Sequence, residues 1–221
     1  KISGLQSLIE AKNQIDLAPF YGHHARENQV ILYAGGILSA ATDRPDLFQK
    51  GVVIPIFNPL TIKDLRSLRK LLPLFLPRKI EINVTTIDDL NLKSKMAKLE
   101  KNEILIVHVG PVAKEVFELF FTKSDIAPVV QGRNSMNLMH LSGIPFLPSS
   151  VVEPYQVNDV PEIAKEALME LDSKLIKQDD PHLFKSIGRF LIASKEKNSP
   201  LNNFFLSHAL DPADVRQDKL Y

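Results

Sequence analysis

The feature of this sequence that most constrains its fold is a repeated alternation of short apolar runs with longer amphipathic segments. Between residues 30 and 148 the two kinds of segment alternate about six times, which is the pattern of an open parallel β-sheet with helices on both faces. We therefore predict an α/β protein with a Rossmann-like open parallel sheet, followed by C-terminal helices. The predicted strands are residues 30–34, 52–57, 79–84, 104–109, 126–130 and 144–148.

Amphipathic periodicity predicts the helices. A first helix is expected in residues 2–15. Thr61 and Asp64 mark the start of a helix over 62–72, because Thr is a good N-cap and an acid in the first turn suits the helix dipole. Further helices are predicted near residues 88–101, 114–121, 136–141, 161–175, 181–194 and 200–210. The resulting divisions are an N-terminal helix and linker (1–29), a Rossmann-like domain (30–160) and C-terminal helices that pack on the same domain (161–221).

Composition excludes several classes of function. The formal net charge of the 221-residue chain is +1, which argues against general nucleic-acid binding. The chain has no cysteine, so disulfides, thiolate metal sites and cysteine nucleophiles are excluded, and a reducing compartment such as the cytoplasm is expected. No apolar run is long enough to be a transmembrane segment, and no signal peptide is visible. Because the chain starts at Lys1 rather than at a methionine, we expect a domain fragment that lacks an N-terminal domain of the same protein.

Polar residues or glycines follow several of the predicted strands. Ligands of open parallel sheets bind outside the carboxyl ends of the strands, so residues at these ends are candidate ligand contacts. They are Gly35, Asn58, Thr85, His108 and Gly132. The histidine has two interpretations, because a histidine at a strand end can hydrogen-bond a ligand or simply cap the strand.

The most informative stretch is residues 126–148, which combines a strand, a polar glycine turn, a short helix and a second strand. Gly132 ends the first strand, and Arg133, Asn134 and Ser135 follow where the helix begins. A flexible backbone, a permanent cation and capping-type side chains thus converge on the positive end of a helix, which is anion-binding chemistry. The structural alternative is that these polar side chains only cap the helix and pair with a surface carboxylate.

Two other clusters also have a functional and a structural interpretation. The segment His23–Glu27 contains adjacent histidines that could be catalytic or bind a metal, but adjacent side chains point in different directions, which favours a surface linker. Gly35 and Gly36 could belong to a phosphate loop. They lack the full spacing of a dinucleotide-binding motif, which favours a plain tight turn.

The turn Gly132-Arg133-Asn134-Ser135, followed by Gly143-Ile144-Pro145, resembles the donor-site motif of glycosyltransferases with the GT-B fold, which consists of two facing Rossmann-like domains. In that superfamily a glycine turn opens a helix aimed at the donor diphosphate, and a Gly-x-Pro strand follows. The members that the sequence resembles most are the glucuronosyltransferases and the peptidoglycan N-acetylglucosaminyltransferases. The resemblance covers residues 100–175.

This resemblance implies the donor-binding C-terminal domain of a hexosyltransferase that moves a sugar from a nucleoside-diphosphate sugar to an unknown acceptor. It implies no metal and no cofactor besides the nucleotide-sugar substrate and, if the reaction inverts the sugar configuration, it places the general base in the missing domain. The implied diphosphate contacts are Gly132, Arg133, Asn134, Ser135, Asn58 and Thr61, the base contacts are His108, Val109 and Gly110, and the donor-sugar contacts are Tyr155 and Gln156.

Several positions depart from the family's pattern. Val130 stands in place of a histidine, Gln131 in place of a glycine, Leu138 in place of an acid that often binds the ribose, and Tyr155 in place of an Asp. These departures motivate a second hypothesis, a non-catalytic Rossmann-like interaction module. A third hypothesis, a dinucleotide-dependent oxidoreductase that uses the glycine pair at Gly35, is disfavoured by the incomplete spacing.

Overall fold

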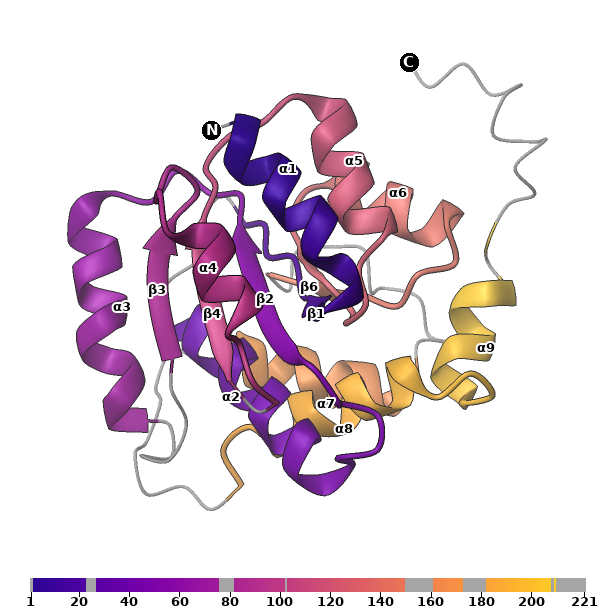
Figure 1. Ribbon diagram of the computed structural model, residues 1–221. Coiled ribbons are helices and arrows are strands. Elements are labelled where there is room, and N and C mark those ends of the chain that lie inside the picture. Colours follow the sequence, from indigo (N-terminus) through magenta and orange to yellow (C-terminus); the bar gives the residue numbers. More distant parts are fainter. Residues whose placement is uncertain are drawn as a thin grey trace.

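The structure is a computed structural model that describes residues 2–22, 27–75, 82–101, 103–149, 161–172, 182–207 and 209 (Figure 1). Strands and helices alternate through most of this length. In chain order the elements are α1 (Ile2–Glu10), η1 (Ala11–Asn13), β1 (Ile15–Leu17), α2 (Glu27–Asp43), β2 (Gly51–Ile56), α3 (Ile62–Phe75), β3 (Ile82–Thr86), α4 (Leu92–Ala97), β4 (Ile104–His108), α5 (Lys114–Thr122), β5 (Val129–Val130), α6 (Arg133–Leu141), β6 (Leu147–Pro148), α7 (Glu162–Leu171), α8 (Lys185–Lys195) and α9 (Pro200–Ser207).

All paired strands run parallel, which confirms the predicted α/β class. Four strands form a sheet in the order β1-β2-β4-β3, and β5 pairs with β6. The two groups meet at Phe20, just beyond β1, which bridges to Ile56 of β2 on one side and to Val129 of β5 on the other. Strands therefore succeed one another across the molecule as β3-β4-β2-β1-β5-β6.

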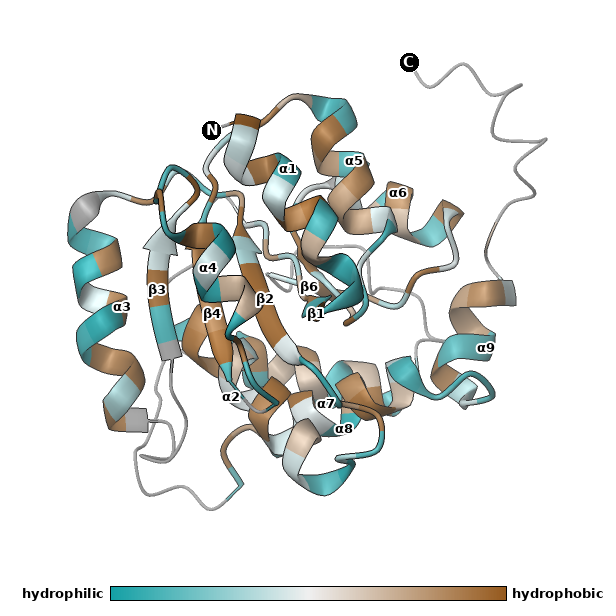
Figure 2. Ribbon diagram, in the orientation of Figure 1, coloured by the Kyte–Doolittle hydropathy of each residue, from teal (hydrophilic) through white to brown (hydrophobic). Residues whose placement is uncertain are grey.

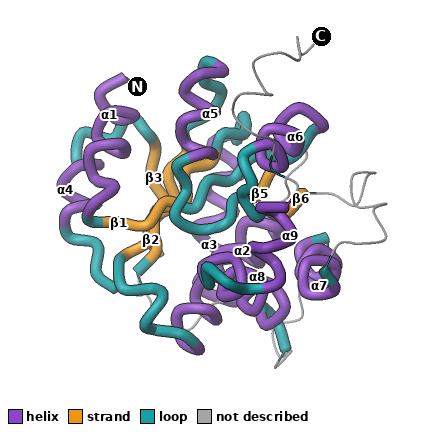
Figure 3. Tube along the Cα trace, turned by 90° about the vertical axis from the view of Figure 1, so that its right-hand side faces the viewer, coloured by secondary structure: helices purple, strands orange, loops and turns teal. Residues whose placement is uncertain are grey.

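Helices cover both faces of this sheet. Figure 3 shows α5 and α6 on one side of the strands, and α2 and α8 on the other. On the second side α2 packs closely against α8 and also contacts α3 and α7, so the C-terminal helices belong to the same packed unit as the sheet. On the first side α1 packs against α4.

The predicted strand 30–34 is wrong, because these residues lie inside helix α2. Residues 29–38 are buried without a break, so the helix has apolar side chains on all sides, and such a run shows no amphipathic period. The glycine pair that we predicted to be a tight turn is in mid-helix. The first strand is instead Ile15–Leu17, so the sheet begins inside the segment that we expected to be a helix and linker.

Glycines make the close approach of α2 to α8 possible. A Cβ added to Gly35 would lie 2.3 Å from the ring of Phe184, and one added to Gly36 would lie 2.2 Å from Cγ2 of Ile187. Gly188 of α8 faces back onto Ser39, whose Oγ would be 2.9 Å from an added Cβ. The glycine pair therefore allows α2 and the segment 184–188 to pack closely. Gly35 lies within α2 and not, as predicted, at the end of a strand.

The hydrophobic core is built around strands whose two faces are both covered. Every residue of β2 and the first four of β4 are buried, and Figure 2 shows these two strands as predominantly hydrophobic ribbons between helices of mixed hydropathy. Among the described residues one charged side chain is buried, and it belongs to β1, the strand next to β2. Asp16 of β1 is 6% exposed and its Oδ2 accepts a hydrogen bond of 2.6 Å from Nζ of Lys195, which ties α8 to the sheet.

Other predicted elements are observed with different boundaries. The helix predicted at 88–101 is only Leu92–Ala97, and the strands predicted at 126–130 and 144–148 are only Val129–Val130 and Leu147–Pro148. The strand predicted at 79–84 is observed at Ile82–Thr86, and the helix predicted to end before Pro73 continues through it to Phe75. The strand predicted at 52–57 is observed one residue earlier, at Gly51–Ile56.

Candidate functional site

The connections of the sheet diverge between β1 and β5. From β1 the chain passes through α2 to the neighbouring strand β2, whereas β5, on the other side of β1, is reached through α5 on the opposite face. Ligands of open parallel sheets bind outside the carboxyl ends of the strands at such a topological switch point. The described segments that leave the two strands here are residues 18–22 and 131–132.

The turn after β5 is the one that the sequence singled out. Gly132 has φ 90° and ψ 143° and is exposed. Residues with a Cβ rarely adopt such a conformation. An added Cβ would meet nothing within 4 Å, so the backbone conformation rather than lack of space calls for glycine. The glycine thus turns the chain from β5 directly into α6.

The N-terminus of α6 carries no negative charge of its own. Its N-cap residue is Gly132, which has no side chain to form a cap, and its first turn contains no acidic residue. The first intrahelical bond is donated by Met136 N–H to the carbonyl oxygen of Gly132 at 3.1 Å, so the preceding amides lack intrahelical acceptors. Asn134 is exposed and Ser135 is half-buried. The side chain of Arg133 lies outside the described part of the structure. This end of α6 is suited to an anion.

Asn58 lies at the end of β2 as predicted, and both polar atoms of its side chain form hydrogen bonds within the protein. Its Oδ1 accepts a hydrogen bond of 2.6 Å from Gly22 N–H, and its Nδ2 donates to the carbonyl oxygen of Gly22. Both residues are buried. The geometry gives Asn58 the role of holding the segment after β1, and leaves the predicted diphosphate contact without a free polar atom on this side chain.

Thr61 caps α3, as the sequence predicted. Asp64 N–H donates to Thr61 Oγ1 at 3.2 Å, while Thr61 N–H and Oγ1–H both donate to Asp64 Oδ2 at 2.7 Å. This reciprocal arrangement is a capping box. The bonds from the Thr61 backbone and hydroxyl hold the pKa of Asp64 below its ordinary value. The hydroxyl that we predicted to contact a diphosphate is therefore used in the cap.

The predicted base-binding residues at the end of β4 are also connected to β2. His108 Nε2 lies 3.0 Å from the carbonyl oxygen of Asn58. The same Nε2 lies 3.3 Å from the backbone nitrogen of Leu60, so it donates to the Asn58 carbonyl when it carries a proton and accepts from Leu60 N–H when it does not. The amides of Val109 and Gly110 both donate to the carbonyl oxygen of Ile56, at 2.9 and 3.1 Å. These two N–H groups are therefore not available to recognise a nucleotide base.

Thr85, the candidate at the end of β3, belongs to a polar cluster. Its Oγ1 donates to Asp89 Oδ2, which also accepts a bond of 2.6 Å from Lys95 Nζ, and Asn91 N–H donates to Asp89 Oδ1 at 2.8 Å. The Lys95 ammonium, followed by the hydroxyl of Thr85 and the amide of Asn91, lowers the pKa of Asp89 well below its usual range. The cluster fixes the turn that follows β3.

Two residues at the carboxyl edge escaped the sequence analysis. Gln29 lies in the first turn of α2, and Ser149 directly follows β6. Gln29 Nε2 donates to the carbonyl oxygen of Ser149 at 2.6 Å. Gln29 was missed because its helix was interpreted as a strand. An available signal was the segment 15–20, apolar except for Asp16, which precedes Tyr21-Gly22 and has the pattern of a short strand followed by a turn.

The remaining candidates lie outside the described residues. These are Tyr155 and Gln156, the predicted donor-sugar contacts, and residues 23–26 of the histidine cluster. Among the described residues, no group of three or more His, Cys, Asp or Glu side chains is arranged to hold a metal ion. Within the same part of the chain, no helix is both long enough and apolar enough to cross a bilayer.

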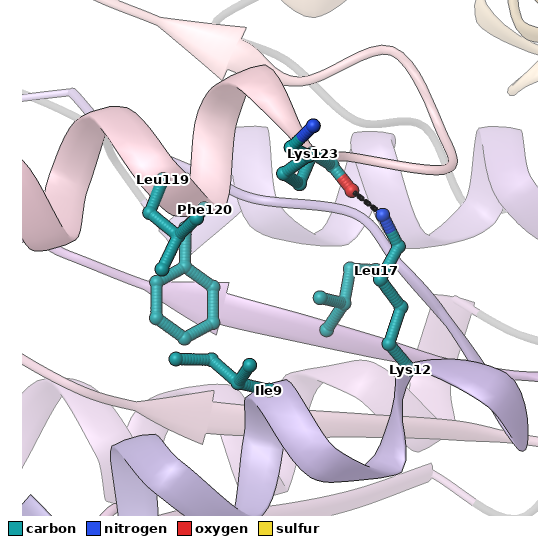
Figure 4. A pocket seen from close by; sticks show the side chains of 6 residues that line it. All are labelled: Ile9, Lys12, Leu17, Leu119, Phe120 and Lys123. Carbon is teal, nitrogen blue, oxygen red and sulfur yellow. Dashed lines mark hydrogen bonds between the residues drawn. The ribbon is translucent and has the colours of Figure 1, made fainter.

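A hollow of about 100 Å³ lies away from the switch-point turns, between α1, β1 and α5 (Figure 4). Its walls are formed by Ile9, Lys12, Leu17, Leu119, Phe120 and Lys123. The Lys12 ammonium closes one side by donating to the carbonyl oxygen of Lys123 at 2.6 Å. The surface of the hollow is mostly apolar and offers no converging polar groups, so this hollow does not have the features of a site that orients a substrate.

The chain is thus an α/β protein with a Rossmann-like parallel sheet, whose best-defined candidate site is the uncapped N-terminus of α6 at the topological switch point. Comparisons with protein-family models, with curated proteins and with solved structures found no match.

Proposed function

We propose that the protein binds the diphosphate of a nucleotide sugar at the N-terminus of α6, and that it is the donor-binding, C-terminal domain of a GT-B-type glycosyltransferase. One observation carries this proposal. The helix that follows β5 begins at a glycine with φ 90°, without a side-chain cap or an acid in its first turn. Such an end attracts anions, and its position is the one where open parallel sheets bind ligands.

The chemistry of the turn suits a leaving nucleoside diphosphate. Arg133 supplies a permanently charged, planar fork that matches phosphate oxygens. The amides of the first turn of α6, together with the side chains of Asn134 and Ser135, complete the phosphate contacts. Negative charge develops on the diphosphate as the sugar departs, and these groups stabilise it without a metal ion. In this proposal Tyr155 and Gln156 contact the donor sugar, and the general base belongs to another domain.

The structure changes how the other predicted contacts are assigned within this proposal. Asn58, Thr61 and His108 act as positioning residues at the carboxyl edge. Asn58 bonds to the backbone of Gly22, His108 lies against the carbonyl oxygen of Asn58, and Thr61 bonds to Asp64 in the cap of α3. A base bound beside β4 would then contact carbonyl oxygens or apolar groups of the loop at Val109. The ligand contacts of the proposal concentrate on the turn at Gly132.

The order of the strands differs in one respect from the doubly wound order 3-2-1-4-5-6. In that order the fourth strand lies beside the first, whereas here β4 lies between β2 and β3. The change removes β4 from between β1 and β5, so the switch point on which the proposal depends lies between β1 and β5 rather than between the first and the fourth strand.

Isothermal titration calorimetry with uridine and guanosine diphosphates and their sugar conjugates tests the proposal. We expect saturable binding, and we expect Arg133→Ala to weaken it by about 1.5 to 3 kcal/mol, the contribution of a hydrogen bond to a charged group. Arg189→Ala is the matched control, because this arginine forms a surface ion pair with Glu166 on the C-terminal helices. Absence of heat with every nucleotide would count decisively against the proposal.

A second function, a non-catalytic interaction module, is favoured by a different observation. Several polar side chains at the carboxyl edge are satisfied within the protein rather than directed to a ligand, including those of Asn58 and Thr61. An unchanged melting temperature in all nucleotides would support this alternative, since a ligand that binds only the folded state raises the melting temperature. Hydrolysis of a nucleotide sugar that Arg133→Ala abolishes would exclude it.

A further inference from the structure

Two buried polar atoms in the described part of the chain have no hydrogen-bond partner: Gln29 Oε1 and Ser149 Oγ. Gln29 is 7% exposed and Ser149 is 4% exposed. A buried polar atom without a partner is unfavourable, and in native proteins it calls for an ordered water, an ion or a ligand. The two residues are also neighbours, because Gln29 Nε2 donates to the carbonyl oxygen of Ser149 at 2.6 Å.

The backbone holds both residues in place. Ser149 N–H donates to the carbonyl oxygen of Val130 at 2.8 Å, so Ser149 extends the pairing of β6 with β5. On α2, one turn after Gln29, Tyr33 O–H donates to the carbonyl oxygen of Ala127 at 2.7 Å and fixes the helix against the segment that leads into β5. The two unpartnered atoms are therefore parts of a rigid framework.

The bond to Ser149 also fixes the orientation of the Gln29 amide. If the amide were turned over, Oε1 would face the carbonyl oxygen of Ser149, and two acceptors would oppose each other. Nε2 must therefore point to this carbonyl and Oε1 away from it. Oε1 can only accept a hydrogen bond, whereas the hydroxyl of Ser149 can donate and accept.

These atoms lie at the same edge of the sheet as the turn at Gly132. Gln29 belongs to the helix that follows β1, Gly132 follows β5, and Ser149 follows β6. β5 lies between the other two strands. One end of the site, at α6, is thus suited to an anion. The other end offers two neutral groups, the acceptor of Gln29 in the first turn of α2 and the hydroxyl of Ser149 after β6.

We propose that Gln29 Oε1 and Ser149 Oγ bind hydroxyl groups of the sugar in the ligand whose diphosphate lies at α6. This inference rests on the proposed function. An acceptor on Gln29 and a donor-acceptor group on Ser149, two residues joined by a hydrogen bond, complement sugar hydroxyls, each of which donates and accepts. Neither group carries a charge that would select a second phosphate. Binding the sugar would supply the partners that both atoms lack.

Ser149→Ala tests the inference, because it removes the hydroxyl and keeps the backbone bonds to Val130 and Gln29. We expect the affinity for a nucleoside-diphosphate sugar to fall about tenfold and the affinity for the nucleoside diphosphate alone to stay unchanged. The melting temperature without ligand should be equal or higher, since the variant removes an unsatisfied polar atom. Ser199→Ala is the contrasting control. Ser199 is also buried, but its hydroxyl bonds to Ala193 and Asn202, so this variant should melt at a lower temperature.

The results separate the inference from the proposed function. If wild-type protein binds neither ligand, the proposed function fails and the inference fails with it. If both ligands bind but Ser149→Ala weakens neither, or weakens both equally, only the inference fails. If a crystal structure of the nucleotide-sugar complex showed an ordered water, and not the sugar, bonded to Gln29 Oε1 and Ser149 Oγ, the inference would also be overturned.

Discussion

The side chain of Asn58 forms two hydrogen bonds with the backbone of Gly22, accepting from its N–H at 2.6 Å and donating to its carbonyl oxygen. These bonds continue the pairing of the segments at the end of β1 and β2, which in the backbone closes with Phe57 N–H bonded to the carbonyl oxygen of Phe20 at 3.0 Å. The side-chain amide of Asn58 thus takes the place of the next pair of backbone hydrogen bonds between the two segments. It fixes the start of the loop that leads to α2 and the switch point.

Asn58→Ala should lower the free energy of unfolding by about 2 to 4 kcal/mol, because it leaves two buried backbone groups of Gly22 without partners. Urea denaturation monitored by circular dichroism measures this loss. Asn137→Ala, at an exposed position of α6, is the control and should change stability by less than about 0.5 kcal/mol. If the two variants had equal stability, the paired bonds would have no structural role.

Gly35→Ala should destabilise the protein by about 1 to 3 kcal/mol, although alanine is the better helix former. The added Cβ would lie 2.3 Å from the ring of Phe184. The cost should largely disappear in a Phe184→Ala background, because that variant removes the opposing ring. A double-mutant cycle in urea measures this coupling. A cost of Gly35→Ala that is the same in both backgrounds would place the strain elsewhere.

Local signals in the sequence predicted the parts of the fold that depend on local chemistry. The strand observed at Ile104–His108 is a continuous apolar run, as expected for a strand covered on both faces. Thr61 and Asp64 predicted their helix start because both partners of the cap lie within one turn. Gly132 was predicted to turn the chain into a helix, and its φ of 90° agrees.

The errors come from interactions that a local pattern does not contain. An apolar run such as 30–34 fits a strand covered on both faces and also a helix buried on all sides, and periodicity alone does not separate the two. The bonds that define the candidate site join distant residues. Asn58 and Gly22 are 36 residues apart, and Gln29 and Ser149 are 120 apart. No spacing rule indicates such pairs, so the roles of these side chains became visible only in the structure.

The cluster around Asp89 should make stability depend on pH in acid. Bonds from Lys95, Thr85 and Asn91 hold the pKa of Asp89 below its ordinary value, so between the two values the unfolded chain binds more protons than the folded one. The free energy of unfolding contributed by Asp89 is therefore fully present above pH ~4, the ordinary aspartate pKa, and is lost as the pH falls below it. Asp89→Asn should show a shallower loss in acid than the wild type, and should be less stable at pH 7 by about 1 to 3 kcal/mol.

Lys95→Met checks the cause of that shift, because the Lys95 ammonium is the largest contributor to it. The pKa of Asp89, measured by carboxyl NMR titration, should rise toward its ordinary value in this variant. Lys98→Met, at an exposed position just beyond α4, is the control and should leave the titration unchanged. Identical titrations in the wild type and Lys95→Met would contradict the assignment.

Two glycines at opposite ends of α6 allow backbone strain to be separated from ligand binding. Gly132 has φ 90° and precedes the helix, and Gly143 has φ 64° and follows it. Alanine at either position should lower the free energy of unfolding by about 1 to 3 kcal/mol, because both conformations are unfavourable for a residue with a Cβ. Only Gly132→Ala should also weaken the binding of uridine or guanosine diphosphate, because only this change redirects the first amides of the helix. Urea denaturation and calorimetry on both variants measure the two effects. If Gly143→Ala weakened nucleoside-diphosphate binding as much as Gly132→Ala, the loss would come from general destabilisation of the helix. If Gly132→Ala bound the diphosphate as tightly as the wild type, the N-terminus of α6 would be excluded as the phosphate site.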